Sequence, residues 1–480
     1  MTISLREAAA ASGGRIIDAE HLPAEARVST DTRTLAAGDV YVALRGEAFD
    51  GHAFVADAVA AGARAIVVDD ASAVPPGVPA LVVADTTAAY LAFAGVARRL
   101  LQARVIAVTG SAGKTTTKHV IARILERADA GTVVATHANE NNEIGVAKLF
   151  LGAPIDAAYV VTEFGARHFG EIAPLARVAR PDVAVLTNIG DAHLEIFGSP
   201  LRLAQTKWGI FATGAHRVLD IALRGCEPDG VARTDDAHAT YFDVRADAAD
   251  AADAVDDVDD ARGSARVTLV GRERVVFRAG GTARAHDLPT HVTVDGEHNV
   301  RNVAAAAAAA FAIGIAPATI ARALRDLDLP AGRYERIDLG THSLVYDGYN
   351  ASMDGTLATL ASFARETATR RIAVLGSMAE LGPEAPAMHA RVGEAAACAR
   401  CAFVLVGGDF ADDLARGARV GGLEAGSVVP FASNAVAIAW LQANLVDGDL
   451  VLLKASRRYR MEEIVAGLRD ARANDEATHA

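Results

Sequence analysis

Residues 105–117 read Val-Ile-Ala-Val-Thr-Gly-Ser-Ala-Gly-Lys-Thr-Thr-Thr, and this stretch decides how the rest of the chain is interpreted. An apolar run rich in β-branched residues ends in a glycine turn, which is followed by a lysine, by hydroxyl residues and by a helical pattern over 119–128. The two glycines allow successive backbone N–H groups to point at an anion, and the new helix adds the positive end of its dipole. Lys114 can reach terminal phosphates, and Thr115 can offer its hydroxyl to Mg²⁺. A Gly-Lys-Thr tripeptide also occurs by chance, so the strand before it and the helix after it carry the prediction of a nucleoside triphosphate site.

Length, composition and charge indicate an enzyme of several domains. At 480 residues the chain is long enough for about three domains. Apolar residues make up 51% of it, but we find no run of about 18 uncharged apolar residues and no secretion signal, so we expect a cytoplasmic protein that does not enter a membrane. The net charge of −13 argues against non-specific binding to nucleic acids. The expected partners are small molecules, and we expect a monomer with reduced thiols at Cys226, Cys398 and Cys401.

An acidic tract over 247–260 contains seven aspartates and no basic residue. Its alternation of alanine and aspartate predicts a solvated, mobile loop, because the charges repel one another and little apolar surface is available for burial. A cation site of the same composition is the alternative.

Short apolar runs alternate with helical patterns along the chain, which predicts an α/β protein of three domains with parallel sheets. The expected boundaries give domains over 1–100, 101–329 and 330–480. Residues 264–296, rich in Val, Thr, Arg and Gly, favour antiparallel strands, and 299–312 predict a helix of almost pure alanine. The expected strands of the parallel sheets are 39–44, 65–69, 80–84, 158–163, 183–188, 343–347, 371–376, 402–406 and 450–454.

Two further polar residues follow expected strands of the central domain. Glu163 ends the strand over 158–163, where its carboxylate would lie at the ligand edge of a parallel sheet and could hold Mg²⁺ directly or through water. A helix-capping or loop glutamate is the alternative. His193 follows the strand over 183–188 and could bind a metal or a phosphate, although a single histidine is more often a structural residue.

Two other features gain meaning only from their order after the phosphate loop. Lys207 lies in a helical stretch over 201–211, where the default interpretation is a solvated surface amine. The polar cluster over 139–145, with Asn142 within it, could hold a substrate or start a helix.

Taken in order, these segments resemble the Mur ligase family, the ATP-dependent ligases that build the peptide of bacterial peptidoglycan. The resemblance covers nearly the whole chain, and residues 31–52 favour the branch that adds D-alanyl-D-alanine to a UDP-N-acetylmuramoyl-tripeptide. The motifs that carry it are Asp31-Thr-Arg33, Gly38–Leu44, Gly46–His52, Thr109–Thr116, Asn141–Gly145, Glu163–Ala166, Pro181–Gly198, Gly296–Asn302, Gly332-Arg333, Asp347–Asn350, Leu375–Gly382 and Lys454–Arg457.

The resemblance implies an N-terminal UDP-substrate domain, a central ATP-binding domain, a C-terminal Rossmann-like domain and a reaction through an acyl phosphate. It implies ATP and two Mg²⁺ ions as cofactors and a carbamylated lysine, N6-carboxylysine, at Lys207. The implied catalytic residues are Lys114, Glu163, His193 and Lys207, and the metal ligands are Thr115, Glu163, His193 and Lys207. The implied ATP-binding residues are Gly110, Ser111, Ala112, Gly113, Lys114, Thr115, Thr116, Asn299, Asn302, Arg333, Asp347 and Tyr349. The implied substrate-binding residues are Asp31, Thr32, Arg33, Phe49, Asp50, Gly51 and His52 on the acid side, Lys454 and Arg457 on the amine side, and Asn142. For Arg457, an ion pair with Glu462 on the following helix is the alternative.

The chain departs from the family pattern mainly on the amine side. Ser352 and Met353 replace an Asn-Pro pair, Ser377 replaces an aspartate and Ala455 replaces a glycine. These departures suit a cell-wall ligase that has diverged, and they also suit a related amide ligase of specialised metabolism that uses another acid and amino acid. A catalytically silent binding protein is a third possibility, against which the retained reactive residues argue.

Overall fold

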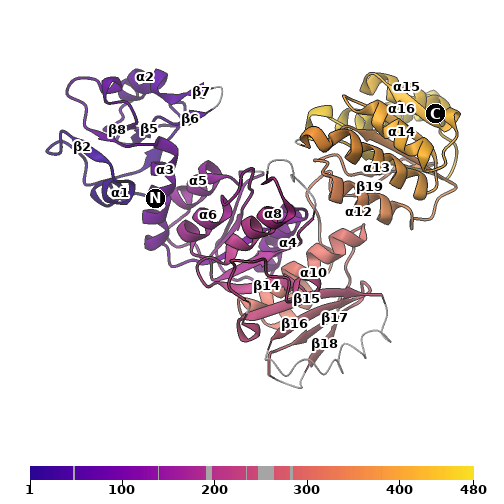
Figure 1. Ribbon diagram of the computed structural model, residues 1–480, viewed down its shortest axis with the longest axis horizontal. Helices are drawn as coiled ribbons and strands as arrows, with labels where there is room; N and C mark the ends of the chain where they lie inside the picture. The colour runs from indigo at the N-terminus through magenta and orange to yellow at the C-terminus, as the bar shows by residue number, and fades with distance from the viewer. Residues whose placement is uncertain are drawn as a thin grey trace.

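The computed structural model describes residues 1–46, 49–138, 140–190, 197–233, 235–246, 264–281, 285–379 and 381–479. These residues form three lobes, each built on its own sheet, and the lobes follow one another along the chain (Figure 1). The expected α/β class with parallel sheets is confirmed. His193 and the acidic tract over 247–260 lie outside the described residues.

The N-terminal lobe contains a sheet in the order β2-β9-β8-β5-β4, in which only β2 runs antiparallel to its neighbour. Its last helix, α3, begins where the Asp85 carboxylate accepts a hydrogen bond from the Ala88 amide at 2.8 Å. The elements of this lobe are β1 (Ile3–Ser4), α1 (Leu5–Ser12), β2 (Arg15–Ile17), β3 (Glu25–Ala26), β4 (Val28–Ser29), β5 (Val40–Val42), β6 (Arg45–Gly46), β7 (Phe49–Asp50), α2 (Val55–Ala60), β8 (Ala65–Val68), β9 (Ala80–Val82) and α3 (Thr86–Leu100).

The central lobe is a sheet in the order β11-β12-β10-β13-β14-β15-β16-β17-β18, counted over the described residues. Strands β10 to β16 pair in parallel, and β17 and β18 extend the sheet antiparallel, as the composition of 264–296 predicts. Helices α4, α10 and α11 cover one face and α3, α5 and α6 the other. The elements are β10 (Arg104–Thr109), α4 (Lys114–Arg127), β11 (Val133–Ala135), α5 (Glu143–Gly152), β12 (Tyr159–Glu163), α6 (Ile172–Ala179), β13 (Val183–Leu186), α8 (Pro200–Trp208), β14 (His216–Asp220), β15 (Ala239–Arg245), β16 (Ala265–Val270), β17 (Arg274–Arg278), β18 (Ala285–Pro289), α10 (Glu297–Ala312) and α11 (Pro317–Ala323).

Helix α10 is enclosed on all sides. Residues 303–310 are fully buried between the sheet and helix α4, and seven of these eight residues are alanines. A helix that is apolar all round is stable only where neighbours surround it. The small side chains allow α10 to lie close to the strands and to α4 (Figure 1).

The C-terminal lobe has a sheet in the order β19-β20-β24-β21-β22-β23, with only β19 antiparallel to its neighbour. Helices α12, α13 and α14 pack on one face, and α15 and α16 pack on the other. The elements are β19 (Glu335–Asp338), β20 (Ser343–Tyr346), α12 (Met353–Phe363), β21 (Arg370–Gly376), α13 (Ala385–Cys398), β22 (Cys401–Gly407), α14 (Ala411–Val420), β23 (Val428–Phe431), α15 (Asn434–Asn444), β24 (Asp449–Lys454) and α16 (Glu462–His479).

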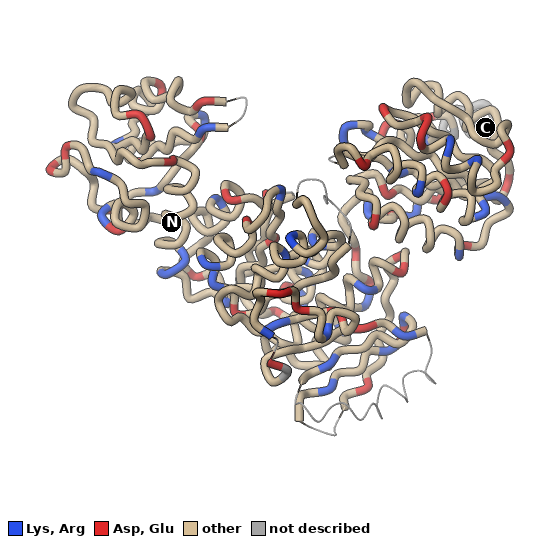
Figure 2. The backbone as a smooth tube through the Cα atoms, viewed as in Figure 1, with Lys and Arg blue, Asp and Glu red and all other residues tan. Residues whose placement is uncertain are grey.

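The lobes are joined by helices. Helix α3 packs on α5 and α6, so that the N-terminal and central lobes share one hydrophobic core. The start of α10 meets α12, where the Glu297 amide donates to the Ser362 hydroxyl at 3.2 Å and Arg365 pairs with the Glu297 carboxylate. Acidic and basic residues are interspersed in all three lobes (Figure 2). No helix among the described residues is long and apolar enough to cross a membrane.

Candidate nucleotide and metal site

The phosphate loop connects β10 to α4, as the sequence predicts. Gly113 has φ 80° and directly precedes the first residue of the helix, Lys114. The Lys114 Nζ donates to the Gly110 carbonyl at 2.8 Å and to the Ser111 carbonyl at 3.2 Å, so the amine lies over the loop. Burial lowers the pKa of Lys114, while the charge of Glu163 opposes this shift. An anion bound in the loop would therefore meet a lysine that is already in place.

A polar pair at the end of β13 fixes the shape of this loop. The Asn188 side chain accepts from the Ala112 amide at 2.9 Å and donates to the Ala112 carbonyl at 3.0 Å, while the Thr187 hydroxyl donates to the same carbonyl at 2.7 Å. Neither residue was among the predicted site residues, although both end an expected strand at its ligand edge. Asn188 and Thr187 therefore preorganise the phosphate loop.

The second asparagine of the alanine-rich helix also contacts the loop. Asn302 lies so close to Gly113 that a Cβ added to this glycine would stand 2.1 Å from the Asn302 Oδ1. Gly113 also has a positive φ, a backbone conformation that residues other than glycine rarely adopt. Both constraints explain why a glycine is needed here.

We expect Gly113→Ala to weaken ADP binding by more than about tenfold, because the loop must move away from Asn302. Gly77→Ala is the matched control, since Gly77 has φ 76° and nothing within 4 Å of an added Cβ. The control should lose only about 1 kcal/mol of unfolding free energy to backbone strain. Titration calorimetry with ADP and thermal unfolding measure both effects, and equal ADP affinities for the two variants would contradict the steric argument.

Glu163 ends β12 with its carboxylate buried beside the loop, at 1% exposure. The Asn141 Nδ2 donates to Oε1 at 2.8 Å, and the Glu163 amide donates to the Thr136 hydroxyl at 3.1 Å. The other oxygen, Oε2, is buried and has no hydrogen-bond partner among the described residues. A buried carboxylate oxygen without a partner is costly unless a cation or a donor joins it. Its place therefore fits Mg²⁺.

The donor set suits Mg²⁺ held jointly by protein and nucleotide. The described residues contain no group of three or more His, Cys, Asp or Glu side chains that could form a complete metal cage. Mg²⁺ is usually bound by one or two carboxylates together with substrate phosphates and water. Glu163 and the Thr115 hydroxyl at the start of α4 fit this pattern. The predicted ligand His193 lies outside the described residues.

Lys207 is a buried residue of α8, with 2% exposure. The alternative of a solvated surface amine is therefore wrong. Burial, together with the nearby charge of Lys114, lowers the pKa of Lys207 to about 7. The lowered pKa favours the neutral, nucleophilic form of the Lys207 amine near pH 7.

Three predicted nucleotide residues gather where the central and C-terminal lobes meet. The Asn299 Nδ2 donates to the Asp295 carbonyl at 2.9 Å and to the Arg333 carbonyl at 3.1 Å. The Arg333 guanidinium lies 4.1 Å from the centroid of the Tyr349 ring. Asn299 therefore ties the start of α10 to the connection between the lobes.

Lys454, expected to face an incoming amine, and Asp347, expected to hold the ribose, contact each other, and both roles stay predictions. Their side chains form an ion pair at 2.7 Å, and their exposures are only 4% and 6%. Although burial alone would raise the pKa of Asp347, the Lys454 ammonium keeps this pKa below its usual value. The Thr359 hydroxyl also donates to the carboxylate, at 2.5 Å. In this arrangement neither side chain is open to a substrate.

Arg457 forms the ion pair with Glu462 that was its alternative. Its Nη1 lies 3.2 Å from the Glu462 Oε1 at the start of α16, while its side chain is 62% exposed. The remaining guanidinium donors are therefore open to a carboxylate, and the substrate role of Arg457 stays a prediction.

The expected substrate residues over 31–33 and 49–52 lie in the N-terminal lobe, which carries β6 and β7 (Figure 1). Asn142 instead caps the start of α5 in the central lobe, where its side chain accepts from the Gly145 amide at 3.0 Å. The polar atoms of 31–33 and 49–52 are bonded mostly to one another: Arg33 pairs with Asp31 at 2.7 Å, and the His52 Nδ1 lies 2.7 Å from the Asp50 Oδ1. Phe49 is half exposed and stacks on Phe54 with 5.5 Å between the ring centroids. Arg45 and Asp69, which contact each other at 3.0 Å, join this group and were not predicted.

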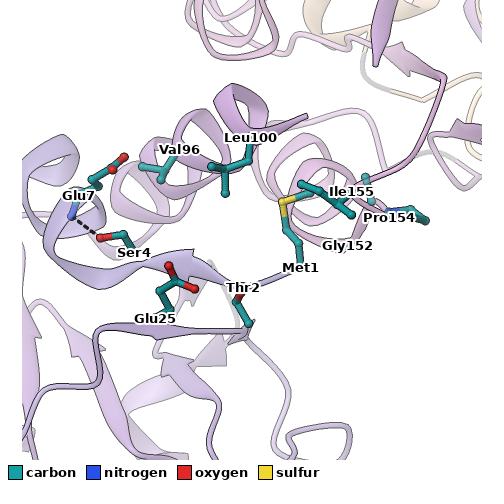
Figure 3. A pocket seen from close by; sticks show the side chains of 11 residues that line it. Met1, Thr2, Ser4, Glu7, Glu25, Val96, Leu100, Gly152, Pro154 and Ile155 are labelled. Atoms are coloured by element: carbon teal, nitrogen blue, oxygen red, sulfur yellow. Dashed lines mark hydrogen bonds between the residues drawn. The ribbon is translucent and has the colours of Figure 1, made fainter. Parts of the chain in front are cut away.

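An open groove of about 610 Å³ lies elsewhere, at the seam between the N-terminal and central lobes (Figure 3). Its walls come from the first residues of the chain, from α3 and from the segment after α5, and include the exposed side chains of Leu100 and Ile155. None of the predicted site residues lines it. The groove is therefore distinct from the phosphate loop.

Comparisons with known proteins identify the family of this chain. Three family models match in order: the Mur ligase family catalytic domain over 26–105, the Mur ligase middle domain over 108–310 and the Mur ligase glutamate ligase domain over 332–457.

Several relatives are named UDP-N-acetylmuramoyl-tripeptide--D-alanyl-D-alanine ligase. One from Synechocystis is 33% identical over 92% of this chain and 91% of its own length, and one from Escherichia coli is 32% identical over 92% of this chain and 93% of its own length. A crystal structure of MurF from Acinetobacter baumannii is 27% identical, with a TM-score of 0.80 over 98% of this chain and 99% of its own. MurF ligase from Thermotoga maritima in complex with ADP, at 24% identity, shares the fold with a TM-score of 0.75 over 94% of this chain and 98% of its own. Because the models span its length and the relatives exceed 30% identity over nine tenths of it, the chain belongs to the Mur ligase family of ATP-dependent, ADP-forming ligases.

Proposed function

We propose that this enzyme joins D-alanyl-D-alanine to UDP-N-acetylmuramoyl-tripeptide, a step in the synthesis of peptidoglycan precursors. The observation that carries the proposal is the match to ligases of that name over 92% of this chain. Two features of the site support the proposal, because phosphoryl transfer needs both. Lys114 lies over the phosphate loop, and the buried Glu163 carboxylate has one oxygen without a hydrogen-bond partner among the described residues.

The reaction needs activation because a carboxylate does not condense with an amine at neutral pH. ATP supplies a phosphoryl group that converts the acid into an acyl phosphate, which the amine then attacks to give the amide, ADP and phosphate. Lys114 and the loop N–H groups stabilise the charge that develops on the transferred oxygens. Glu163 and Thr115 would hold the Mg²⁺ that neutralises the same charge.

Lys207 would take part as a carbamate. Its neutral amine can form an N–C bond to carbon dioxide with release of a proton, which replaces a cation by an anion. The lowered pKa, about 7, and the burial of Lys207 support this step, because the neutral amine is the reactive form. The carbamate, together with His193, would then hold a second Mg²⁺. Asn299, Asn302 and Arg333 would surround the nucleotide.

A ligase for another acid and amine is the second candidate. The observation that favours it is the set of substitutions on the C-terminal lobe, where Ser377 is buried and accepts from the Phe410 amide at 2.9 Å. Ser352 caps α12 by accepting from the Gly355 amide at 3.3 Å. Both serines have bonds within the lobe, so the C-terminal lobe accommodates the two substitutions.

Phosphate release from MgATP with UDP-N-acetylmuramoyl-tripeptide, with and without D-alanyl-D-alanine, tests the proposal. We expect release only when both substrates are present, together with a product heavier by one dipeptide residue in the mass spectrum. Release that depends on other acid and amine pairs, with none for this pair, would establish the second candidate.

We also infer that the enzyme works as a monomer in the cytoplasm. ATP and UDP-linked precursors are found in the cytoplasm, and the three lobes of a single chain match the three family models of a Mur ligase. Sedimentation at catalytic concentrations tests the oligomeric state.

A further inference from the structure

A second lysine of helix α4 is buried beside the site. Lys118 lies one turn after Lys114 and is 5% exposed. A buried ammonium is tolerated only when hydrogen bonds or opposite charges compensate for its lost hydration. Lys118 lies within α4, beyond the phosphate loop, so its hydrogen-bond partners indicate its role.

Those partners belong to the segment after β11. The Lys118 Nζ donates to the Thr136 carbonyl at 2.6 Å and to the Ala138 carbonyl at 3.3 Å. Ala138 has φ 45°, a left-handed conformation that costs energy for any residue with a Cβ. Lys118 therefore holds a strained turn in one position.

The same segment holds Glu163 at two points. The Thr136 hydroxyl accepts from the Glu163 amide at 3.1 Å, and the Asn141 Nδ2 donates to the Glu163 Oε1 at 2.8 Å. The Asn141 carbonyl in turn accepts from the Gly165 amide at 2.8 Å, just beyond Glu163. These bonds leave the other carboxylate oxygen, Oε2, as the one without a partner among the described residues.

We propose that Lys118 is a positioning residue for the metal: it anchors the turn at 136–138, and the turn orients the Glu163 carboxylate toward Mg²⁺. This inference rests on the proposed role of Glu163 as a metal ligand. Groups that orient a ligand from behind typically change metal affinity by about 10- to 100-fold when they are removed. Lys118 contacts neither nucleotide nor substrate in this scheme.

The decisive variant is Lys118→Met, which keeps the length of the buried stem and removes the charge and the donors. Calorimetry should show that the Kd for MgADP rises about tenfold, while the Kd for ADP in EDTA changes less than about twofold. The Mg²⁺ concentration for half-maximal activity should rise in parallel, with a smaller change in kcat at saturating Mg²⁺. An equal loss of affinity for ADP with and without metal would overturn the proposal, because it would indicate general damage to the loop.

Lys148→Met is the matched control. Lys148 also binds this segment, through the Glu140 Oε1 at 2.5 Å, but its side chain is 63% exposed on α5. We expect MgADP affinity to stay within about twofold of wild type for this variant. A metal defect as large as that of Lys118→Met would mean that any weakening of the segment has the same result, and would overturn the specific role of Lys118.

Asn141→Ala tests the other end of the connection and serves if Lys118→Met does not fold. It should weaken MgADP binding about tenfold and leave metal-free ADP binding unchanged. The double variant should lose no more MgADP affinity than the more damaging of the two single variants, because both changes release the same carboxylate. If the two losses of affinity multiply, this expectation is wrong.

Glu163→Gln separates the metal-ligand hypothesis from the positioning hypothesis. If it leaves the Mg²⁺ dependence unchanged, the proposed metal ligand is wrong. If it alters this dependence and Lys118→Met does not, only the positioning role fails.

Discussion

Lys114→Ala is expected to lower kcat by at least about 10³-fold while the protein stays folded. The lysine Nζ lies over the Gly110 and Ser111 carbonyls, in the position from which it would meet the terminal phosphates. Removing it takes a fixed positive charge away from the oxygens that become more negative during phosphoryl transfer. ATP binding should weaken much less, since the loop amides and the Asn188 contacts remain.

Phosphate release and amide formation measure the loss of kcat, and thermal unfolding checks the fold. Lys148→Ala is a suitable control, because it removes a lysine with an exposed side chain from the same lobe. Activity of Lys114→Ala within threefold of wild type would mean that the loop is not a phosphoryl-transfer site.

Lys207→Ala should be the second most damaging change, with a loss of at least about 100-fold in kcat, because it removes a proposed metal ligand. Lys207→Glu should recover part of this loss by supplying a carboxylate of similar reach. The pH dependence follows from the lowered pKa of Lys207, about 7. Below this value the amine is protonated and cannot form the carbamate, so wild-type activity should fall as the pH decreases through 7.

Bicarbonate distinguishes the carbamate from other causes of this pH dependence. In buffer freed of carbon dioxide, added bicarbonate should restore wild-type activity near pH 7 and leave Lys207→Glu unaffected. A crystal structure at about pH 8 with a bare Lys207 ammonium away from any metal would refute the carbamate.

Local patterns were sufficient to predict the fold class and the phosphate loop. The strands expected at 65–69, 158–163 and 450–454 correspond to β8, β12 and β24 within one residue at either end. They could be found because each is a short apolar run that ends in a turn, and burial on both faces of a parallel sheet requires this pattern. The phosphate loop could be found because its backbone geometry depends on glycines at fixed positions.

Pairings between distant segments could not be predicted in this way. Lys454 and Asp347 are 107 residues apart, and nothing near either residue indicates that they neutralise each other. Lys118 looks like an ordinary surface lysine of a helix until the position of Thr136 is known. The partners of a side chain depend on which strands and helices lie next to it. That arrangement is set by contacts between segments far apart in the sequence, and local patterns do not reveal these contacts.

The enclosed alanine helix α10 has a consequence for natural variation in this protein. Its first turns carry Asn299 and Asn302, and Asn302 rests against Gly113, while the following turns have no free volume on any side. A larger side chain anywhere over 304–310 would push the helix away from the sheet and from α4, and Asn302 would move with it. Natural variants should therefore be rare along this whole segment, although none of its alanines could touch a ligand. A mutational scan should accordingly find the alanines over 304–310 as intolerant of substitution as the phosphate loop.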